Sequence, residues 1–107
     1  MKEKRSFALV FDAEVKRHLR AIDAKYHALI RSAIEEQLRF EPGVETRNHK
    51  PLLRPPALGA TWEMRFGPGN RFRVLYAVDA ERREVQILAV GVKERNCLII
   101  GGEKVEL

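Results

Sequence analysis

Two runs within residues 61–78, in each of which every second side chain is large and apolar, limit the possible folds of this chain more than any other feature of its sequence. Residues 62–66 read WEMRF and residues 72–78 read FRVLYAV, and every second residue in each run is large and apolar. Because successive side chains of a β-strand point to opposite faces, each run predicts a strand with one apolar face. Gly-Pro-Gly-Asn at 67–70 has turn composition. The segment therefore predicts an antiparallel hairpin that contributes its apolar face to the core.

Three arginines are expected on the other face of this hairpin. Arg65, Arg71 and Arg73 alternate with the apolar residues, so they would project away from the core. A guanidinium group binds phosphate through paired hydrogen bonds, and a rigid sheet holds such groups in place. The pattern predicts a face that binds the phosphates of RNA.

Two helices are predicted before the hairpin. The first spans about 12–23 and begins at Asp12, a good N-cap residue. The second spans about 25–40, carries one nearly continuous apolar stripe, and is followed by Glu-Pro-Gly at 41–43, which stops a helix. So short a connection predicts a helical hairpin. The apolar run 6–11 before it is typical of a buried strand.

The remaining segments complete a two-layer α+β domain. Residues 44–60 have no sustained period and are predicted to form a long loop. Residues 84–93 are nearly all apolar, as expected of a central strand covered on both faces, and Gly91 marks a bulge or a close backbone approach. The end of the chain, 98–107, is expected either to add a short edge strand or to wrap back on the core. The predicted order is β-α-α-β-β-β, with the helical hairpin packed on a mostly antiparallel sheet, in one domain spanning 1–107.

Composition narrows the functional classes. Lys and Arg number 20 against 15 Asp and Glu, which gives a net charge of +5 and suits a polyanionic partner. The single Cys97 excludes an internal disulfide and a CxxC metal site. The apolar run 7–11 is too short for a signal peptide or a membrane span. We therefore expect a cytoplasmic protein that needs neither a metal nor a cofactor.

Several segments, taken in order, resemble a known family. They are Lys50-Pro51-Leu52, the strand pair WEMRF and RFRVLYAVD, and the run ILAVGVKERN. In this order and spacing they resemble the RelE/ParE superfamily of toxins from type II toxin–antitoxin modules, over essentially the whole chain. The resemblance implies a RelE-like fold and a cognate antitoxin that wraps the toxin. In the RelE branch it implies metal-independent cleavage of mRNA on the ribosome, by attack of a ribose 2′-hydroxyl that leaves a cyclic phosphate.

The resemblance also implies roles for individual residues. Arg73 matches the strand arginine that holds the scissile phosphate, and Arg65 matches a basic position on the preceding strand. Lys93 lies where members carry a cationic acid or clamp. His49 lies where some members place the base, and an imidazole titrates near neutral pH. Further cations are expected to contact RNA: Lys50, Arg54, Arg71 and Arg95.

One departure from the family pattern keeps other functions open. Members that cleave RNA efficiently carry a Tyr or His just past the last core strand, where this chain has Cys97, Leu98, Ile99 and Ile100. Two alternatives to cleavage therefore remain. One is a ParE-like protein that poisons DNA gyrase, and the other is a noncatalytic module whose basic face docks an acidic antitoxin segment.

Overall fold

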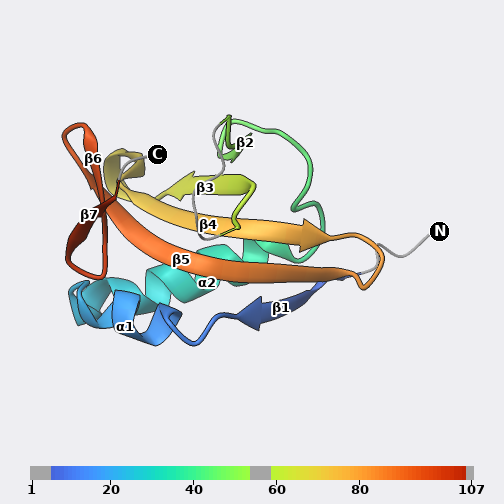
Figure 1. Cartoon of the computed structure of the whole chain (residues 1–107), viewed down its shortest axis with the longest axis horizontal. Coiled ribbons are helices and arrows are strands. Elements are labelled where there is room, and N and C mark those ends of the chain that lie inside the picture. The colour runs from blue at the N-terminus through green and yellow to red at the C-terminus, as the bar shows by residue number, and fades with distance from the viewer. Residues whose placement is uncertain (1–5, 54–58, 106–107) are drawn as a thin grey trace.

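Two helices lie along one face of a twisted, mostly antiparallel sheet in the computed structural model, which describes residues 6–53 and 59–105 (Figure 1). The elements in chain order are β1 (Ala8–Phe11), α1 (Val15–Arg20), the 3₁₀ turn η1 (Ala24–Tyr26), α2 (His27–Leu38), β2 (His49–Pro51), β3 (Trp62–Phe66), the 3₁₀ turn η2 (Pro68–Asn70), β4 (Phe72–Asp79), β5 (Glu84–Glu94), β6 (Cys97–Ile100) and β7 (Glu103–Val105). The predicted α+β class and the predicted order of the main elements are confirmed.

Strand β5 organises the sheet because it pairs on both sides. The strands lie in the order β2-β3-β4-β5-β6-β7, and every neighbouring pair on this path is antiparallel. On the edge away from β4, β5 pairs in parallel with β1 along its first half and with β6 along its second half. A change of register opposite Leu75 and Tyr76 marks a bulge in β5, where Leu88 has no partner. In a regular strand, residues three positions apart point to opposite faces. The extra residue of the bulge places Ile87 and Val90 on the same face, so both side chains enter the main core.

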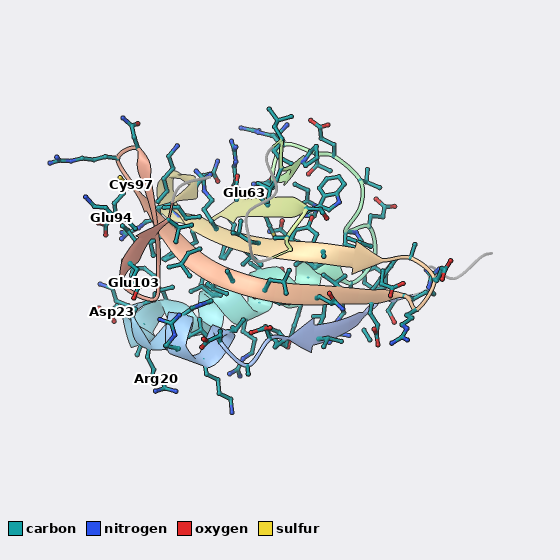
Figure 2. All side chains as sticks on the ribbon, viewed as in Figure 1. Arg20, Asp23, Glu63, Glu94, Cys97 and Glu103 are labelled. Carbon is teal, nitrogen blue, oxygen red and sulfur yellow. The ribbon has the colours of Figure 1, made fainter. Side chains whose placement is uncertain are left out.

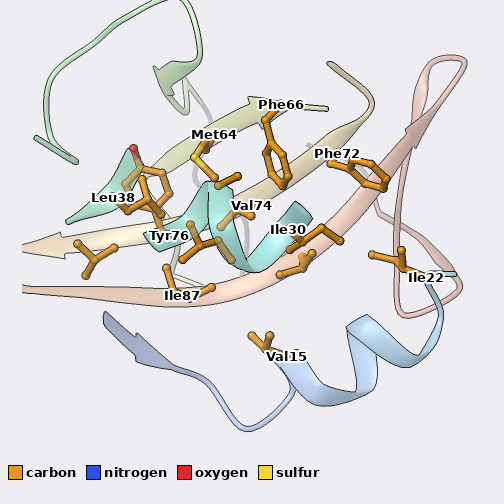
Figure 3. Close-up of a cluster of buried hydrophobic side chains, with 14 residues drawn as sticks. Val15, Ile22, Ile30, Leu38, Met64, Phe66, Phe72, Val74, Tyr76 and Ile87 are labelled. Atoms are coloured by element: carbon orange, nitrogen blue, oxygen red, sulfur yellow. The ribbon is translucent and has the colours of Figure 1, made fainter. Parts of the chain in front are cut away.

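The main core fills the space between the helices and the sheet (Figure 3). Ile30, Ile34 and Leu38 come from α2, one helical turn apart. They meet buried residues of the hairpin, among them Phe72 and Tyr76, which are both fully buried. The buried Tyr76 hydroxyl donates a hydrogen bond to the Pro42 carbonyl oxygen at 2.7 Å, so its polar end is satisfied as the predicted packing required.

The helices are shorter than their periodicity indicates. Helix α1 begins at Val15 with Glu14 at its N-cap, and Asp12 instead accepts a hydrogen bond from the Glu14 amide at 2.9 Å. The start of the second predicted helix is the 3₁₀ turn η1, which Asp23 caps by accepting from the Lys25 amide. Aspartate favours such local side-chain bonds over a continuous helix, which shortens both segments.

Two predictions about strands are wrong. Strand β1 is an edge strand rather than a buried one, because no other described strand pairs with its outer side and Val10 and Phe11 are 43% and 48% exposed. The predicted loop 44–60 contains β2, which pairs with β3 through the register His49 to Met64. A strand of three residues has no measurable alternation, and its pairing with a distant segment is not visible locally.

The sheet face away from the helices is partly apolar. Leu75 and Ala89 are buried there beneath Leu98 and Ile100 of β6, which fold over the sheet with β7. Gly91 permits the close approach of β6 to β5, since a Cβ atom there would lie 2.7 Å from the Ile99 carbonyl oxygen. The predicted close backbone approach at Gly91 is therefore confirmed, and the bulge lies three residues earlier. The β6–β7 hairpin forms a wall over one end of this face.

Candidate phosphate-binding groove

Two grooves run along the sheet face opposite the helices. The first, of about 500 Å³, lies between β3, β4 and the β6–β7 hairpin, and is lined by Glu63, Arg65, Arg73, Lys93, Asn96, Cys97, Leu98, Lys104 and Val105. The second, of about 610 Å³, is lined by Glu45, Lys50, Pro51, Leu52, Leu53, Glu63 and Arg65. Glu63 and Cys97, both labelled in Figure 2, border the first groove. Because Glu63 and Arg65 border both grooves, the two form one continuous track.

An arginine pair with a shared carboxylate lies between the two grooves. Arg65 and Arg73 are direct cross-strand partners in β3 and β4. Glu63 Oε1 accepts from Arg65 Nε at 2.7 Å and from Arg73 Nη1 at 3.2 Å. Like charges at opposed sheet positions destabilise the pairing, and the carboxylate between them offsets that repulsion. The structure thus brings together Arg65 and Arg73, as predicted from the alternation.

The two arginines differ in their exposure to solvent. Arg73 is 8% exposed, and its Nε donates to the Asn70 carbonyl oxygen at 3.1 Å. Burial lowers the pKa of the Arg73 guanidinium, and the nearby Glu63 carboxylate opposes that change. The guanidinium remains charged, because an arginine side chain does not lose its proton in a protein. The Arg65 side chain is 42% exposed and open to the groove. Both groups can bind an anion, and neither can serve as a base.

Two lysines line the far side of the first groove. Lys93, near the end of β5, is exposed and borders the groove together with Arg73, as the resemblance implies. Lys104 of β7 also borders it, although no sequence pattern marks that residue. It belongs to a strand of three residues whose place beside the groove depends on its pairing with β6. The groove therefore offers cations from four different strands.

The other predicted RNA contacts are placed as follows. Lys50 borders the second groove and forms an ion pair with Glu45 at 3.5 Å. Arg95 is exposed in the turn between β5 and β6, with a φ of 56°, and lines neither groove. Arg54 lies outside the described residues.

Arg71 does not lie on the same face as Arg73. It follows η2 in a helical backbone conformation, with φ of −76° and ψ of −23°, so the strand alternation starts only at Phe72. Its guanidinium carbon lies 5.8 Å from the centre of the Tyr26 ring and 5.5 Å from that of Phe72. Tyr26 belongs to the helical layer. The prediction that Arg71 joins the phosphate-binding face is wrong.

His49 is also on the helical side of the sheet. It pairs with Met64, a core residue, and cross-strand partners point to the same face. Its Nε2 lies 3.2 Å from Gln37 Oε1 of α2, and the described residues offer no partner to Nδ1. Burial lowers the pKa of this imidazole. The sheet separates His49 from Arg73, so the structure does not place it where a base for the groove is needed.

The other two histidines are equally remote from the groove. His18 is buried in α1, where its Nδ1 accepts a hydrogen bond from the Val90 amide at 3.3 Å. His27 Nε2 lies 2.8 Å from the Leu19 carbonyl oxygen and 2.9 Å from that of Ile22. All three imidazoles of the chain thus contact groups of the helical layer or of the core.

Clusters of metal-ligating side chains and membrane-spanning helices are both absent from the residues that the structure describes. Among them, no group of three or more His, Cys, Asp and Glu side chains could hold a metal ion. No helix within 6–53 or 59–105 is long and apolar enough to cross a membrane.

Comparison with known proteins identifies the fold. No family model matches the chain, and no curated protein matches it significantly by sequence. Among solved structures, it is similar to a chain of the toxin–antitoxin complex RelBE2 from Mycobacterium tuberculosis, with 28% sequence identity and a TM-score of 0.66. The match covers 82% of this chain and 99% of that chain, so it includes nearly the whole domain and not one hairpin alone. The resemblance read from the sequence is thus confirmed, and the chain has the RelE-like toxin fold.

Proposed function

We propose that this chain is the toxin of a type II toxin–antitoxin module and that it inhibits translation by cleaving mRNA on the ribosome. The observation that carries the proposal is the arginine pair between the two grooves, with Arg65 and Arg73 fixed on adjacent strands. The fold supports it, since the similar structure is a toxin–antitoxin complex. The track formed by the grooves is lined by Lys50, Lys93 and Lys104 as well, so an RNA backbone can follow it.

The chemistry needs stabilisation of charge on the scissile phosphate. The ribose 2′-oxygen forms a bond to phosphorus, the bond to the 5′-oxygen breaks, and a 2′,3′-cyclic phosphate and a 5′-hydroxyl result. Negative charge grows on the nonbridging oxygens, where the guanidinium groups of Arg65 and Arg73 stabilise it. The ammonium group of Lys93, across the same groove, can protonate the leaving 5′-oxygen. No step in this scheme requires a metal ion.

The 2′-hydroxyl must also lose a proton. Because the three imidazoles lie away from the groove, water or a group of the ribosome accepts this proton. Orientation of the reacting groups by the ribosome lowers the barrier, by about 7–11 kcal/mol in the most favourable intramolecular cases. We therefore expect cleavage on ribosomes and little or none on free RNA.

The cognate antitoxin is expected to cover the same groove. The arginines and lysines of the groove suit an acidic segment of the antitoxin, supplied as an amphipathic helix or an added strand. Such a segment would exclude RNA while it is bound. Copurification of the two chains, followed by protection of Arg65 and Lys93 from chemical modification, would test this placement.

The test of the function compares two assays on the antitoxin-free chain. We expect cleavage of mRNA on programmed ribosomes, with a cyclic phosphate at the new 3′ end. Free RNA of the same sequence should be cleaved far more slowly. Rapid cleavage of free RNA would contradict the ribosome-dependent mechanism.

Gyrase inhibition is the second candidate function, favoured by the same absence of an imidazole from the groove. In that case, supercoiling would stop at toxin concentrations that leave mRNA intact. A supercoiling assay with purified gyrase, run beside the ribosome assay, separates the two functions.

A further inference from the structure

An acidic side chain lies between the two arginines of the groove. Glu63 is 4% exposed, and its Oε1 accepts hydrogen bonds from both Arg65 and Arg73. By its charge alone, a carboxylate opposes the binding of an anion beside it. Its presence at this position of an otherwise cationic groove therefore calls for a physical reason.

We propose that Glu63 is a positioning residue that holds the guanidinium groups of Arg65 and Arg73 side by side as one receptor for a single phosphodiester group. The identification of that group as an RNA phosphodiester rests on the proposed function. The two arginines occupy directly opposed positions on β3 and β4, where their charges repel each other. One oxygen shared between them allows both to remain there before any ligand arrives.

The hydrogen bonds of the pair leave donors available to a ligand. Glu63 accepts hydrogen bonds from Nε of Arg65 and Nη1 of Arg73, and the Asn70 carbonyl oxygen accepts one from Nε of Arg73. Within the described part of the chain, no hydrogen-bond acceptor engages the Nη atoms of Arg65 or Nη2 of Arg73. Guanidinium groups bind phosphate oxygens in pairs, and fixed rotamers reduce the entropy lost on binding. Glu63 thus orients the donors without occupying all of them.

A competing explanation makes the opposite prediction. If Glu63 merely competed with phosphate for the arginines, removing its charge would strengthen RNA binding. General electrostatics also predicts stronger RNA binding, because the change raises the net charge of the protein by one. If Glu63 positions the arginines, removing its charge weakens binding despite the added positive charge. The sign of the change in affinity distinguishes the two explanations.

The experiment measures binding of a short single-stranded 2′-O-methyl RNA, which lacks the attacking hydroxyl, to the antitoxin-free full chain. Glu63→Gln is compared with Glu36→Gln, which makes the same charge change at an exposed carboxylate of α2 that borders neither groove. We expect Glu63→Gln to lower the affinity by about tenfold and the salt slope by about 0.7 for each phosphate that the variant no longer binds. Glu36→Gln should bind as tightly as the original chain or more tightly. In an Arg65→Ala background, Glu63→Gln should have much less effect, because the pair is already broken.

Glu63→Asp provides a second test that does not change the net charge. It withdraws the carboxylate by one methylene, so weaker binding by a folded Glu63→Asp variant would report position alone. It also replaces Glu63→Gln if that variant fails to fold by circular dichroism. Equal or tighter binding by Glu63→Gln, or full affinity in Glu63→Asp, would overturn the inference.

A parallel titration with inorganic pyrophosphate separates this inference from the proposed function. Pyrophosphate binding that depends on Glu63, in a chain that binds no RNA, would retain the receptor and remove the RNA function. A chain that binds neither probe would remove both. Glu63-dependent RNA binding without any cleavage on ribosomes would retain the receptor and contradict only the nuclease function.

Discussion

The amide of Val90 donates a hydrogen bond to Nδ1 of His18, at 3.3 Å, where none of the described strands lies along the edge of β5 away from β4. On this edge β5 pairs with β1 as far as Ile87 and with β6 from Gly91 onward, so Val90 falls between the two. A buried amide without an acceptor is costly, and the imidazole supplies the acceptor that a strand would otherwise provide. The bond requires a neutral His18, with its proton on Nε2.

The first prediction concerns pH. Burial, and then the neighbouring Arg17, lower the pKa of His18, while Glu14 and Asp12 oppose the change, and burial lowers the pKa of His49. Both pKa values are thus lower in the folded chain than the ordinary 6.5, and the unfolded chain binds more protons as the pH falls. The free energy of unfolding should be highest above about pH 6.5 and should fall as the pH drops through the folded pKa values.

Urea unfolding between pH 8 and 5 measures this dependence. His49→Gln removes one titrating group and should flatten the curve in part. An unfolding free energy that does not change over this range would show that neither histidine must remain neutral in the fold.

The second prediction concerns the stability of the arginine pair. Arg73→Ala removes one partner of the buried Glu63 and should lower the free energy of unfolding by about 3 kcal/mol. Arg65→Ala removes a half-exposed partner and should cost about 1 kcal/mol or less. Arg73→Ala combined with Glu63→Gln should cost less than the sum of the two single changes, since the buried charge is gone. Chemical denaturation of the four variants measures these differences, and equal costs for the two arginines would contradict the difference in burial.

The third prediction concerns Lys93 as the proton donor. Lys93→Ala should lower the rate of cleavage on ribosomes by about a hundredfold or more, because general acid catalysis contributes about that much. Arg95→Ala is the matched control, since it removes one exposed positive charge two residues away that lines neither groove. Single-turnover rates at saturating ribosome concentrations separate the chemical step from binding. Similar rates for the two variants would show that Lys93 contributes only its positive charge and is not the proton donor.

The fourth prediction concerns the close approach of β6 to β5 at Gly91. Gly91→Ala places a Cβ atom 2.7 Å from the Ile99 carbonyl oxygen, and this close approach should cost about 1–3 kcal/mol and displace the wall of the groove. Gly43→Ala is the control, because nothing lies within 4 Å of the added atom. Gly91→Ala should lower both the thermal unfolding temperature and the RNA affinity. Gly43→Ala should change neither. A stable Gly91→Ala variant with full affinity would show that the hairpin adjusts freely.

Periodicity predicts this fold well wherever an element is long enough to show its pattern. Strands β3 and β4 and helix α2 each repeat their period, β5 is a nearly continuous apolar run, and all four lie near their predicted places. The same reasoning fails where one residue leaves the pattern, as at Arg71, whose backbone belongs to the preceding turn. It fails again where a short strand pairs with a distant one, as at His49, whose face is set by Met64.

The arginine pair can be predicted from the sequence, but the role of its carboxylate cannot. Alternation places Arg65 and Arg73 on one face, and it places Glu63 there too. The sequence gives no reason to assign Glu63 to the site, because an acidic residue has the wrong charge for a phosphate-binding face. Only the hydrogen bonds of the folded chain show that it serves both arginines.

The wall that β6 and β7 add to the groove also sets an order of events during synthesis. The helices and the β3–β4 hairpin leave the ribosome first, carrying the arginine pair, while Lys93, Lys104 and the crossing hairpin follow later. The first groove is therefore complete only after β5 and the β6–β7 hairpin have been made and have left the ribosome. Under the proposed function, nascent chains that end before Lys104 lack the complete groove and should not cleave mRNA.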